Sequence, residues 1–269
     1  MPPALRSIAL PRQVTLPYVE QGDPAGVPLL LLHGFTDSWR AFEPVLSHLP
    51  ETIHAFALTQ RGHGDASRPP SGYHLPDFVA DMAAFLDALQ LAAAVIVGGS
   101  SGGFVARRLA IDHPERTRGL VFLGSPGALR DKPAVLELWN STIAKLTDPI
   151  DPVFVRTFQA SGLARPVPPA FLETMVHESL KVPAFVWRAT FEGLLDDDSF
   201  GHLNTIKVPS LIVWGDRDAF LPRSDQEALA AALAGSRLVV YPGAGHAVYW
   251  EEPARVASDL VAFIGDLGR

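Results

Sequence analysis

Three short segments that lie far apart in the chain carry residues typical of acyl-transfer chemistry. They are residues 98–103 (GGSSGG), 215–218 (GDRD) and 243–246 (GAGH). A serine between glycines on a strand-to-helix turn can act as an exposed nucleophile, and here an acid and then a histidine follow it. The serine motif alone is weak evidence, because it arises by chance in roughly one such chain in ten. The ordered set of three segments indicates a Ser-Asp-His hydrolase.

The serine motif matches in two registers, because both Ser100 and Ser101 fit the pattern G-x-S-x-G. The Ser100 register puts Gly102 and Gly103 where the following helix must pack closely against the sheet. In the Ser101 register, Phe104 would occupy that crowded position. A glycine-rich turn can instead bind phosphate, but no lysine follows as it does in a P-loop. We therefore predict that Ser100 is the nucleophile.

Candidates for the base and the acid follow two later apolar stretches. His246 lies on a loop of small residues, where it can turn toward the serine as general base and then as general acid. His33, by contrast, is expected to be structural. A catalytic histidine needs a buried carboxylate that fixes its tautomer and stabilises its charged form. Asp216 and Asp218 both follow the apolar run at 211–214, and the residues themselves leave both open.

Short apolar runs alternate with stretches of helical periodicity along most of the chain. The predicted strands cover residues 14–20, 29–32, 53–58, 95–97, 120–123, 211–214 and 238–241. The predicted helices cover residues 39–49, 77–89, 104–111, 225–233 and 253–267. This alternation indicates βαβ units and a mostly parallel sheet. Between 127 and 205 it gives way to helical patches and prolines, which predict a helical insertion over the carboxyl edge of the sheet. The acidic run at 196–198 is expected to be a solvated loop or a helix cap.

Residues 97–103 (VGGSSGG), with 32–35 (LHGF) upstream, resemble the α/β-hydrolase superfamily, and in particular its capped, esterase-like members. The resemblance covers nearly the whole chain. It implies an α/β fold with a mostly parallel eight-stranded sheet flanked by helices and a helical cap inserted after the sixth strand. We accordingly expect residues 1–126 and 206–269 to form the core domain and residues 127–205 to form the cap.

The resemblance also assigns roles that the residues alone leave open. In families that residues 215–218 resemble, the acid is the later aspartate, which is Asp218 in this chain. Some relatives place the acid after the sixth strand, where residues 124–126 (GSP) offer no carboxylate. By resemblance, the backbone N–H groups of Phe35 and Ser101 form the oxyanion hole. One departure is Thr59, which stands at a structural position where the family commonly has aspartate.

The amino-acid composition excludes several classes of binding partner and cofactor. The 269 residues are 48% apolar and carry a net charge of −7, without a basic cluster. Nucleic acid and membranes are therefore not expected as partners. The absence of cysteine excludes disulfides and thiolate metal sites, and we expect neither a metal nor a cofactor. Because residues 1–10 have no continuous apolar run, we expect a cytoplasmic protein, as a monomer or a small homo-oligomer.

The expected cap is rich in aromatic and aliphatic residues, which favours an apolar substrate. The residues expected to contribute to the substrate pocket are Trp139, Phe158, Trp187 and Val248. Candidates for a single charged contact are Arg156, Arg165 and Arg188. The sequence thus predicts a hydrolase of small-to-medium apolar carboxylic esters or lactones that acts through an acyl-enzyme.

Two alternatives remain open. A carbon–carbon bond hydrolase of ring-cleavage products uses the same triad plus a cap arginine, although such relatives often have tryptophan where Ala247 stands. A non-catalytic ligand receptor on the same fold is the other alternative, and intact candidates for every triad role argue against it.

Overall fold

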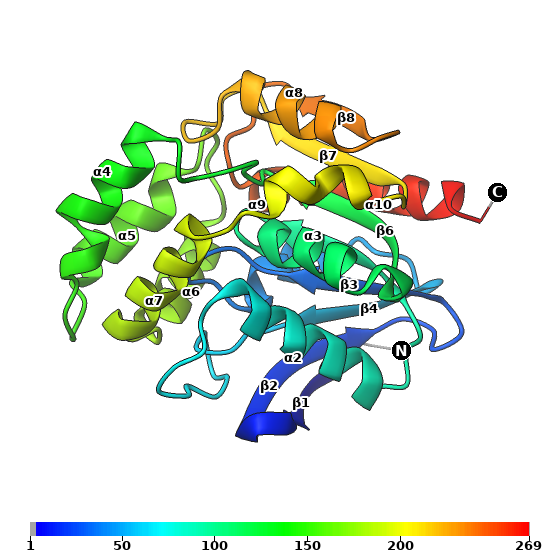
Figure 1. The fold of residues 1–269 in the computed structure, drawn as a ribbon, viewed down its shortest axis with the longest axis horizontal. Coiled ribbons are helices and arrows are strands. Elements are labelled where there is room, and N and C mark those ends of the chain that lie inside the picture. The colour runs from blue at the N-terminus through cyan, green and yellow to red at the C-terminus, as the bar shows by residue number, and fades with distance from the viewer. Residues whose placement is uncertain (1–3, 269) are drawn as a thin grey trace.

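The computed structural model describes residues 4–268 and places one eight-stranded sheet between two layers of helices (Figure 1). The strand order is β1-β2-β4-β3-β5-β6-β7-β8. β2 pairs antiparallel with β1 and β4, and the remaining pairs are parallel. The strands are β1 (Ala4–Leu10), β2 (Val14–Gln21), β3 (Val27–Leu32), β4 (Ile53–Leu58), β5 (Ala94–Gly99), β6 (Thr117–Leu123), β7 (Ser210–Gly215) and β8 (Arg237–Tyr241). This architecture confirms the predicted fold class.

Helices cover both faces of the sheet, and each face has its own hydrophobic core. One core contains α2 (Leu75–Ala88), α3 (Gly102–Asp112) and α8 (Arg223–Ala232). The other contains α1 (Glu43–Leu46), α9 (Val248–Glu251) and α10 (Pro253–Asp266). Along β3, Leu30 and Leu32 belong to the first core, whereas Leu29 and Leu31 belong to the second. The continuous apolar run of β3 follows from burial on both faces.

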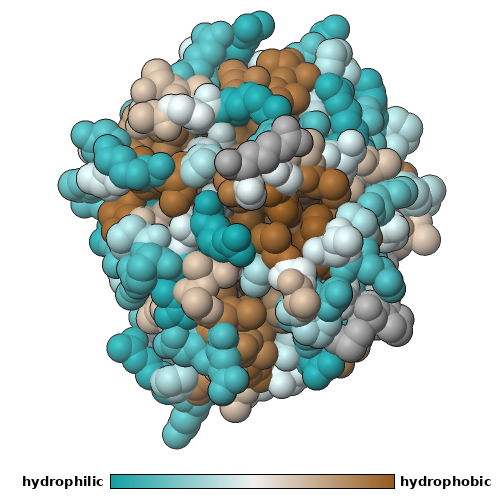
Figure 2. Space-filling view, turned by 90° about the vertical axis from the view of Figure 1, so that its right-hand side faces the viewer, coloured by the Kyte–Doolittle hydropathy of each residue, from teal (hydrophilic) through white to brown (hydrophobic). Residues whose placement is uncertain are grey.

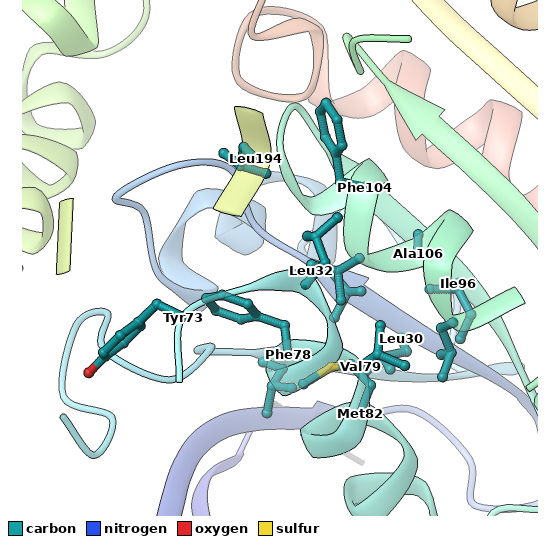
Figure 3. Close-up of a cluster of buried hydrophobic side chains, with 14 of the residues drawn as sticks. Leu30, Leu32, Tyr73, Phe78, Val79, Met82, Ile96, Phe104, Ala106 and Leu194 are labelled. Atoms are coloured by element: carbon teal, nitrogen blue, oxygen red, sulfur yellow. The ribbon is translucent and has the colours of Figure 1, made fainter. Parts of the chain in front are cut away.

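The first core is seen in Figure 3, where side chains of α2, α3, β3 and β5 meet. Phe78 and Met82, four residues apart on one face of α2, both belong to this cluster, and Met82 lies near Leu30 of β3. Leu194 from α7 (Ala184–Leu195) reaches the same cluster. The helical insertion therefore shares the hydrophobic core of the sheet.

The insertion lies between β6 and β7, at the end of the sheet where the parallel strands finish (Figure 1). Its helices are α4 (Pro133–Ser141), α5 (Pro152–Ser161), α6 (Pro169–Leu180) and α7. This confirms a helical insertion after the sixth strand. On the side of the molecule away from the insertion, hydrophilic side chains surround separate hydrophobic areas (Figure 2). Within residues 4–268, no helix has the length and apolar character needed to cross a membrane.

The structure adds one strand that the sequence analysis missed. β1 lies at the edge of the sheet and pairs with β2 from Ala4 opposite Glu20 to Leu10 opposite Val14. Most of its side chains face solvent, including Leu5, which is 64% exposed. An edge strand of this kind has no continuous apolar run for sequence analysis to detect. The helical stretch expected at 39–49 is a 3₁₀ turn, Trp39–Phe42, followed by the single turn of α1.

Both ends of the insertion are bound by one buried arginine of α3. Arg107 donates to the carbonyl oxygens of Pro126 (3.1 Å) and Gly127, where the insertion begins. Where the insertion ends, it donates to Ser199 Oγ (2.6 Å) and pairs with Asp197. The acidic run was expected to be solvated or to cap a helix, and this holds in part: Asp196 and Asp198 are exposed, and Asp197 Oδ1 accepts from the N–H of Ser199 (3.1 Å), the first residue of a 3₁₀ helix. The solvated part of the expectation fails for Asp197, whose carboxylate is only 2% exposed. It is buried because the Arg107 guanidinium reaches it from the core.

This arrangement predicts different effects for two adjacent arginines. Arg107→Met leaves the Asp197 carboxylate buried without its partner, so we expect the free energy of unfolding to fall by about 3–5 kcal/mol. Arg108→Met is the matched control, because that side chain is 28% exposed and pairs with Asp112 near the surface. We expect it to change stability by about 0.5 kcal/mol or less. Urea unfolding of both variants measures the difference, and equal losses would contradict the proposed anchor.

Candidate active site

The glycine–serine segment forms a sharp turn between β5 and α3. Ser100 follows the last residue of β5 and has a left-handed φ of +47°. Its N–H donates to the carbonyl oxygen of Leu123 (2.9 Å), which fixes the turn against β6. A Cβ atom at Gly98 would collide with the backbone of Gly103. The turn thus holds a strained serine between obligatory glycines, as an exposed nucleophile requires.

The Ser100 side chain is joined to a histidine and an aspartate by hydrogen bonds. His246 Nε2 lies 2.8 Å from Ser100 Oγ, and His246 Nδ1 lies 2.9 Å from Asp218 Oδ2. The Asp218 side chain is fully buried, whereas 15% of the His246 side chain is exposed. A neutral imidazole fits both contacts when Nδ1–H donates to the carboxylate and Nε2 accepts from the serine hydroxyl.

The structure distinguishes between the alternative serines and the alternative aspartates. Ser101 occupies the N-cap position of α3, next to the serine that contacts His246. The other oxygen of Asp218 accepts from the N–H groups of Phe220 (2.8 Å) and Leu221 (3.0 Å). Asp216 instead accepts from the N–H of Gly243 (2.6 Å) and thereby stabilises the loop that precedes His246. Asp218 is therefore the carboxylate that can orient the imidazole.

The loop that begins at His33 provides the second part of the site. His33 Nε2 accepts from the N–H of Gln60 (3.0 Å), and His33 Nδ1 lies 2.8 Å from the carbonyl oxygen of Gly34. Burial, together with neighbouring His63, holds the pKa of His33 well below its usual value, so the ring is neutral. His33 thus has the structural role expected of it. Among the described residues, no acceptor is bound by the N–H of Phe35 or Ser101, so both groups are free to bind an oxyanion.

A cavity of about 160 Å³ lies between this site and the insertion. Ser100, His246, Phe35 and Ser101 line its floor. The remaining walls are mainly apolar and come from the insertion, from α3 and from the loop after β7, with Phe104, Leu129, Leu138, Phe158, Phe191, Leu194 and Phe220 among them. Of the described residues that line the cavity, none is a lysine or an arginine. The cavity therefore suits an apolar ligand placed directly over the serine.

Only one of the four residues expected in the pocket lines this cavity, namely Phe158. Trp187 is fully buried behind the wall, with ring centroids 5.2 Å from Phe35 and 5.3 Å from Phe158. Trp139 stacks on Phe191 at 5.7 Å, and Val248 is buried in the core on the far face of the sheet. The structure corrects these three positions, because their side chains support lining residues instead of facing the cavity.

Sequence analysis also missed a buried polar group at the cavity. Asp37 lies two residues after Phe35, and its Oδ1 accepts from Gln159 Nε2 (3.0 Å) in α5. Burial raises the pKa of Asp37 to about 7, against the lowering effects of Gln159, His246, the Gly34 backbone and Tyr249. A charged residue two positions after the LHGF segment was the available signal, but its partners lie far away in the sequence.

The comparisons with known proteins agree with this fold. The family profile of the alpha/beta hydrolase fold matches residues 27–253, and the chain belongs to this family. The chain is 30% identical over 254 residues to a 2-hydroxymuconate semialdehyde hydrolase of Pseudomonas sp. (strain CF600), a match that covers 90% of this chain and 88% of that protein. It is 26% identical over 267 residues to monoacylglycerol lipase abhd6-B of Xenopus laevis, covering 93% and 79%. An esterase structure from Exiguobacterium antarcticum superposes with a TM-score of 0.86 at 22% identity, covering 96% and 98%, and shows the shared fold.

The raised pKa of Asp37 predicts a pH-dependent contribution to stability. Between about pH 4 and 7, the native chain holds a proton on Asp37 that the unfolded chain has released. Stability must then fall as the pH rises, by up to about 1.4 kcal/mol per pH unit from this group. Asp37→Asn removes the titration, so we expect its stability relative to the wild type to rise from pH 4 to pH 7.

Urea unfolding of both proteins at several pH values measures this difference. The matched control is Asp131→Asn, which removes a carboxylate that is 74% exposed. A wild-type minus Asp37→Asn difference that stays constant across this pH range, as in the control, would show that Asp37 is not protonated in the native state.

Proposed function

We propose that the protein is a serine hydrolase that cleaves carboxylic esters or lactones of small-to-medium apolar substrates through an acyl-enzyme. The observation that carries this proposal is the hydrogen-bonded chain from Asp218 through His246 to Ser100, which opens into an apolar cavity. Residues 127–205 are proposed as the cap over this cavity, and residues 1–126 and 206–269 as the core domain.

In the acylation step, Ser100 Oγ attacks the ester carbonyl carbon while His246 Nε2 takes the hydroxyl proton. The negative charge that develops on the carbonyl oxygen is stabilised by the N–H groups of Phe35 and Ser101. Asp218 holds the imidazole in place and stabilises its positive charge. His246 then gives the proton to the leaving alcohol, and a water molecule cleaves the acyl-enzyme by the same sequence of proton transfers.

A carbon–carbon bond hydrolase of ring-cleavage products is the second candidate, because one relative at 30% identity is a 2-hydroxymuconate semialdehyde hydrolase. The candidate cap arginines do not favour it. Arg156 forms an exposed pair with Glu173, and Arg165 pairs with Glu252. Arg188 donates to the carbonyl oxygen of Leu146. With these guanidinium groups engaged away from the cavity lining, an apolar ester is the better match.

A series of p-nitrophenyl esters from acetate to octanoate tests the proposal. We expect a burst of p-nitrophenol followed by turnover, with kcat/KM that rises with acyl length until the acyl chain no longer fits the cavity. Ser100→Ala and His246→Ala should each lower kcat by about 10⁴-fold or more. Ser101→Ala is the matched control, because its backbone N–H is retained, and we expect it to keep most of the activity.

Four outcomes would contradict parts of this proposal. Full activity in Ser100→Ala with loss of activity in Ser101→Ala would show that Ser101, and not Ser100, is the nucleophile. Steady turnover by His246→Ala would exclude the triad. If the wild type binds the ester specifically but shows neither a burst nor turnover, the protein is a receptor. Preferential cleavage of a ring-cleavage dienoate would favour the carbon–carbon bond hydrolase.

A further inference from the structure

We infer that two side chains of the cap, Gln159 of α5 and Ser179 of α6, position the oxyanion loop and thereby set the rate of ester cleavage. The oxyanion loop is residues 33–37 (HGFTD), and we call Gln159 and Ser179 the cap clamp. The inference rests on the proposed function and adds positioning residues to it. Both clamp side chains bind the two residues that directly follow the oxyanion donor Phe35.

Ser179 forms hydrogen bonds with both oxygen atoms of Thr36, the backbone carbonyl oxygen and the side-chain hydroxyl. Ser179 Oγ donates to the carbonyl oxygen of Thr36 (3.1 Å) and lies 3.0 Å from Thr36 Oγ1. It also accepts from Gln159 Nε2. A hydroxyl has one donor and two acceptor sites, so Ser179 uses all three when the Thr36 hydroxyl donates to it. Because Ser179 is fully buried, these bonds have no competition from solvent.

Gln159 binds the loop one residue further on. Its Nε2 donates to Asp37 Oδ1 (3.0 Å), and the Asp37 carboxyl group is in turn bound by the backbone of Gly34 and by the Tyr249 hydroxyl. Tyr249 belongs to α9, close behind His246. Through these contacts Asp37 links Gln159 of the cap to Gly34, on the other side of Phe35 in the oxyanion loop. It also links the cap to α9, the helix that follows the catalytic histidine.

The conformation of the loop requires such support. Thr36 has a φ of +66°, in the left-handed region that is a genuine outlier for a β-branched residue. Backbone strain of this kind persists only where surrounding contacts hold it. The polar contacts that hold Thr36 come from the cap clamp. Without them, we expect the loop to relax and to shift the N–H of Phe35 from its position over Ser100.

Such a shift would act on the transition state more than on substrate binding. An oxyanion donor contributes about 100- to 1,000-fold to kcat, and its distance to the oxygen must be about 2.7–3.1 Å. A displacement of about 1 Å can cost about 100-fold. Ser179 lies outside the lining of the cavity, so its effect must pass through the loop.

The test uses Ser179→Ala and Gln159→Met in the full chain. The matched controls are Thr174→Ala on α6 and Thr157→Ala on α5, whose hydroxyls bond to carbonyl oxygens of their own helices. Steady-state hydrolysis of a p-nitrophenyl ester gives kcat and KM, and thermal unfolding by circular dichroism shows whether each variant folds. If Ser179→Ala does not fold, Gln159→Met carries the comparison, because it keeps the length and approximate volume of the side chain. Gln159 itself lines the cavity, so for this variant the ketone measurement below, together with an unchanged KM, assigns the effect to the loop.

A trifluoromethyl ketone with the same acyl chain gives a second measurement that reports on the oxyanion hole. The serine Oγ forms a bond to the ketone carbon, the carbonyl π electrons move to the oxygen, and the hydroxyl proton passes to the histidine. The resulting hemiketal oxyanion occupies the hole. The inhibition constant therefore measures how well the hole is formed.

We expect both clamp variants to lose about 10- to 100-fold in kcat with KM within about threefold of wild type. The inhibition constant of the ketone should rise by the factor by which kcat/KM falls, and the controls should stay within about twofold on every measure. Folded clamp variants with wild-type kcat would overturn the inference. Loss of kcat with unchanged ketone affinity would also overturn it. A wild type that neither hydrolyses the ester nor binds the ketone would instead refute the proposed function, and the inference with it.

Discussion

The close approach of α3 to the end of β5 is the constraint on which the site depends. A Cβ atom at Gly98 would collide with the backbone of Gly103, so only glycine allows the chain to turn this sharply. A Cβ atom at Gly102 would collide with the backbone of Leu32, so α3 can also approach the end of β3 only with glycine there. Ser100 is thereby left at the top of the turn with a left-handed φ. The N–H of Ser101 lies at the start of α3, where a backbone amide has no acceptor within the helix. One backbone constraint thus positions both the proposed nucleophile and one of the proposed oxyanion donors.

The insertion is tied to this turn and to the histidine loop, and is not a separately packed lid. Arg107 of α3 binds both of its ends, and Leu194 contributes to the hydrophobic core of the sheet. The carbonyl oxygen of Gly162, just after α5, accepts from the N–H of His246 (2.7 Å). Gln159 and Ser179 bind the oxyanion loop. The insertion therefore helps to position both the proposed base and the proposed oxyanion hole, besides lining the cavity.

The elements that sequence analysis predicted are those whose residues form an apolar run or an amphipathic helical pattern. Seven strands and the larger helices of the sheet layers lie where the apolar runs and periodicities placed them. β1 was missed because an exposed edge strand carries no such pattern, and the buried position of Asp197 was missed because its partner, Arg107, is 90 residues away. Three of the four predicted pocket residues were wrong for a related reason. A large aromatic side chain such as Trp187 can line a cavity or support its wall, and residue type does not distinguish the two.

The sequence by itself determined the order of the elements, the strand-to-helix turn at Ser100 and the presence of an acid and a histidine after two later strands. These features follow from local rules, namely periodicity, glycine sterics and the convergence of parallel strand ends at one edge. Only the tertiary structure decided which side chains face the cavity and that Asp37 meets Gln159 across 122 residues. Such contacts depend on how the insertion packs over the sheet, and no spacing within either segment encodes that packing.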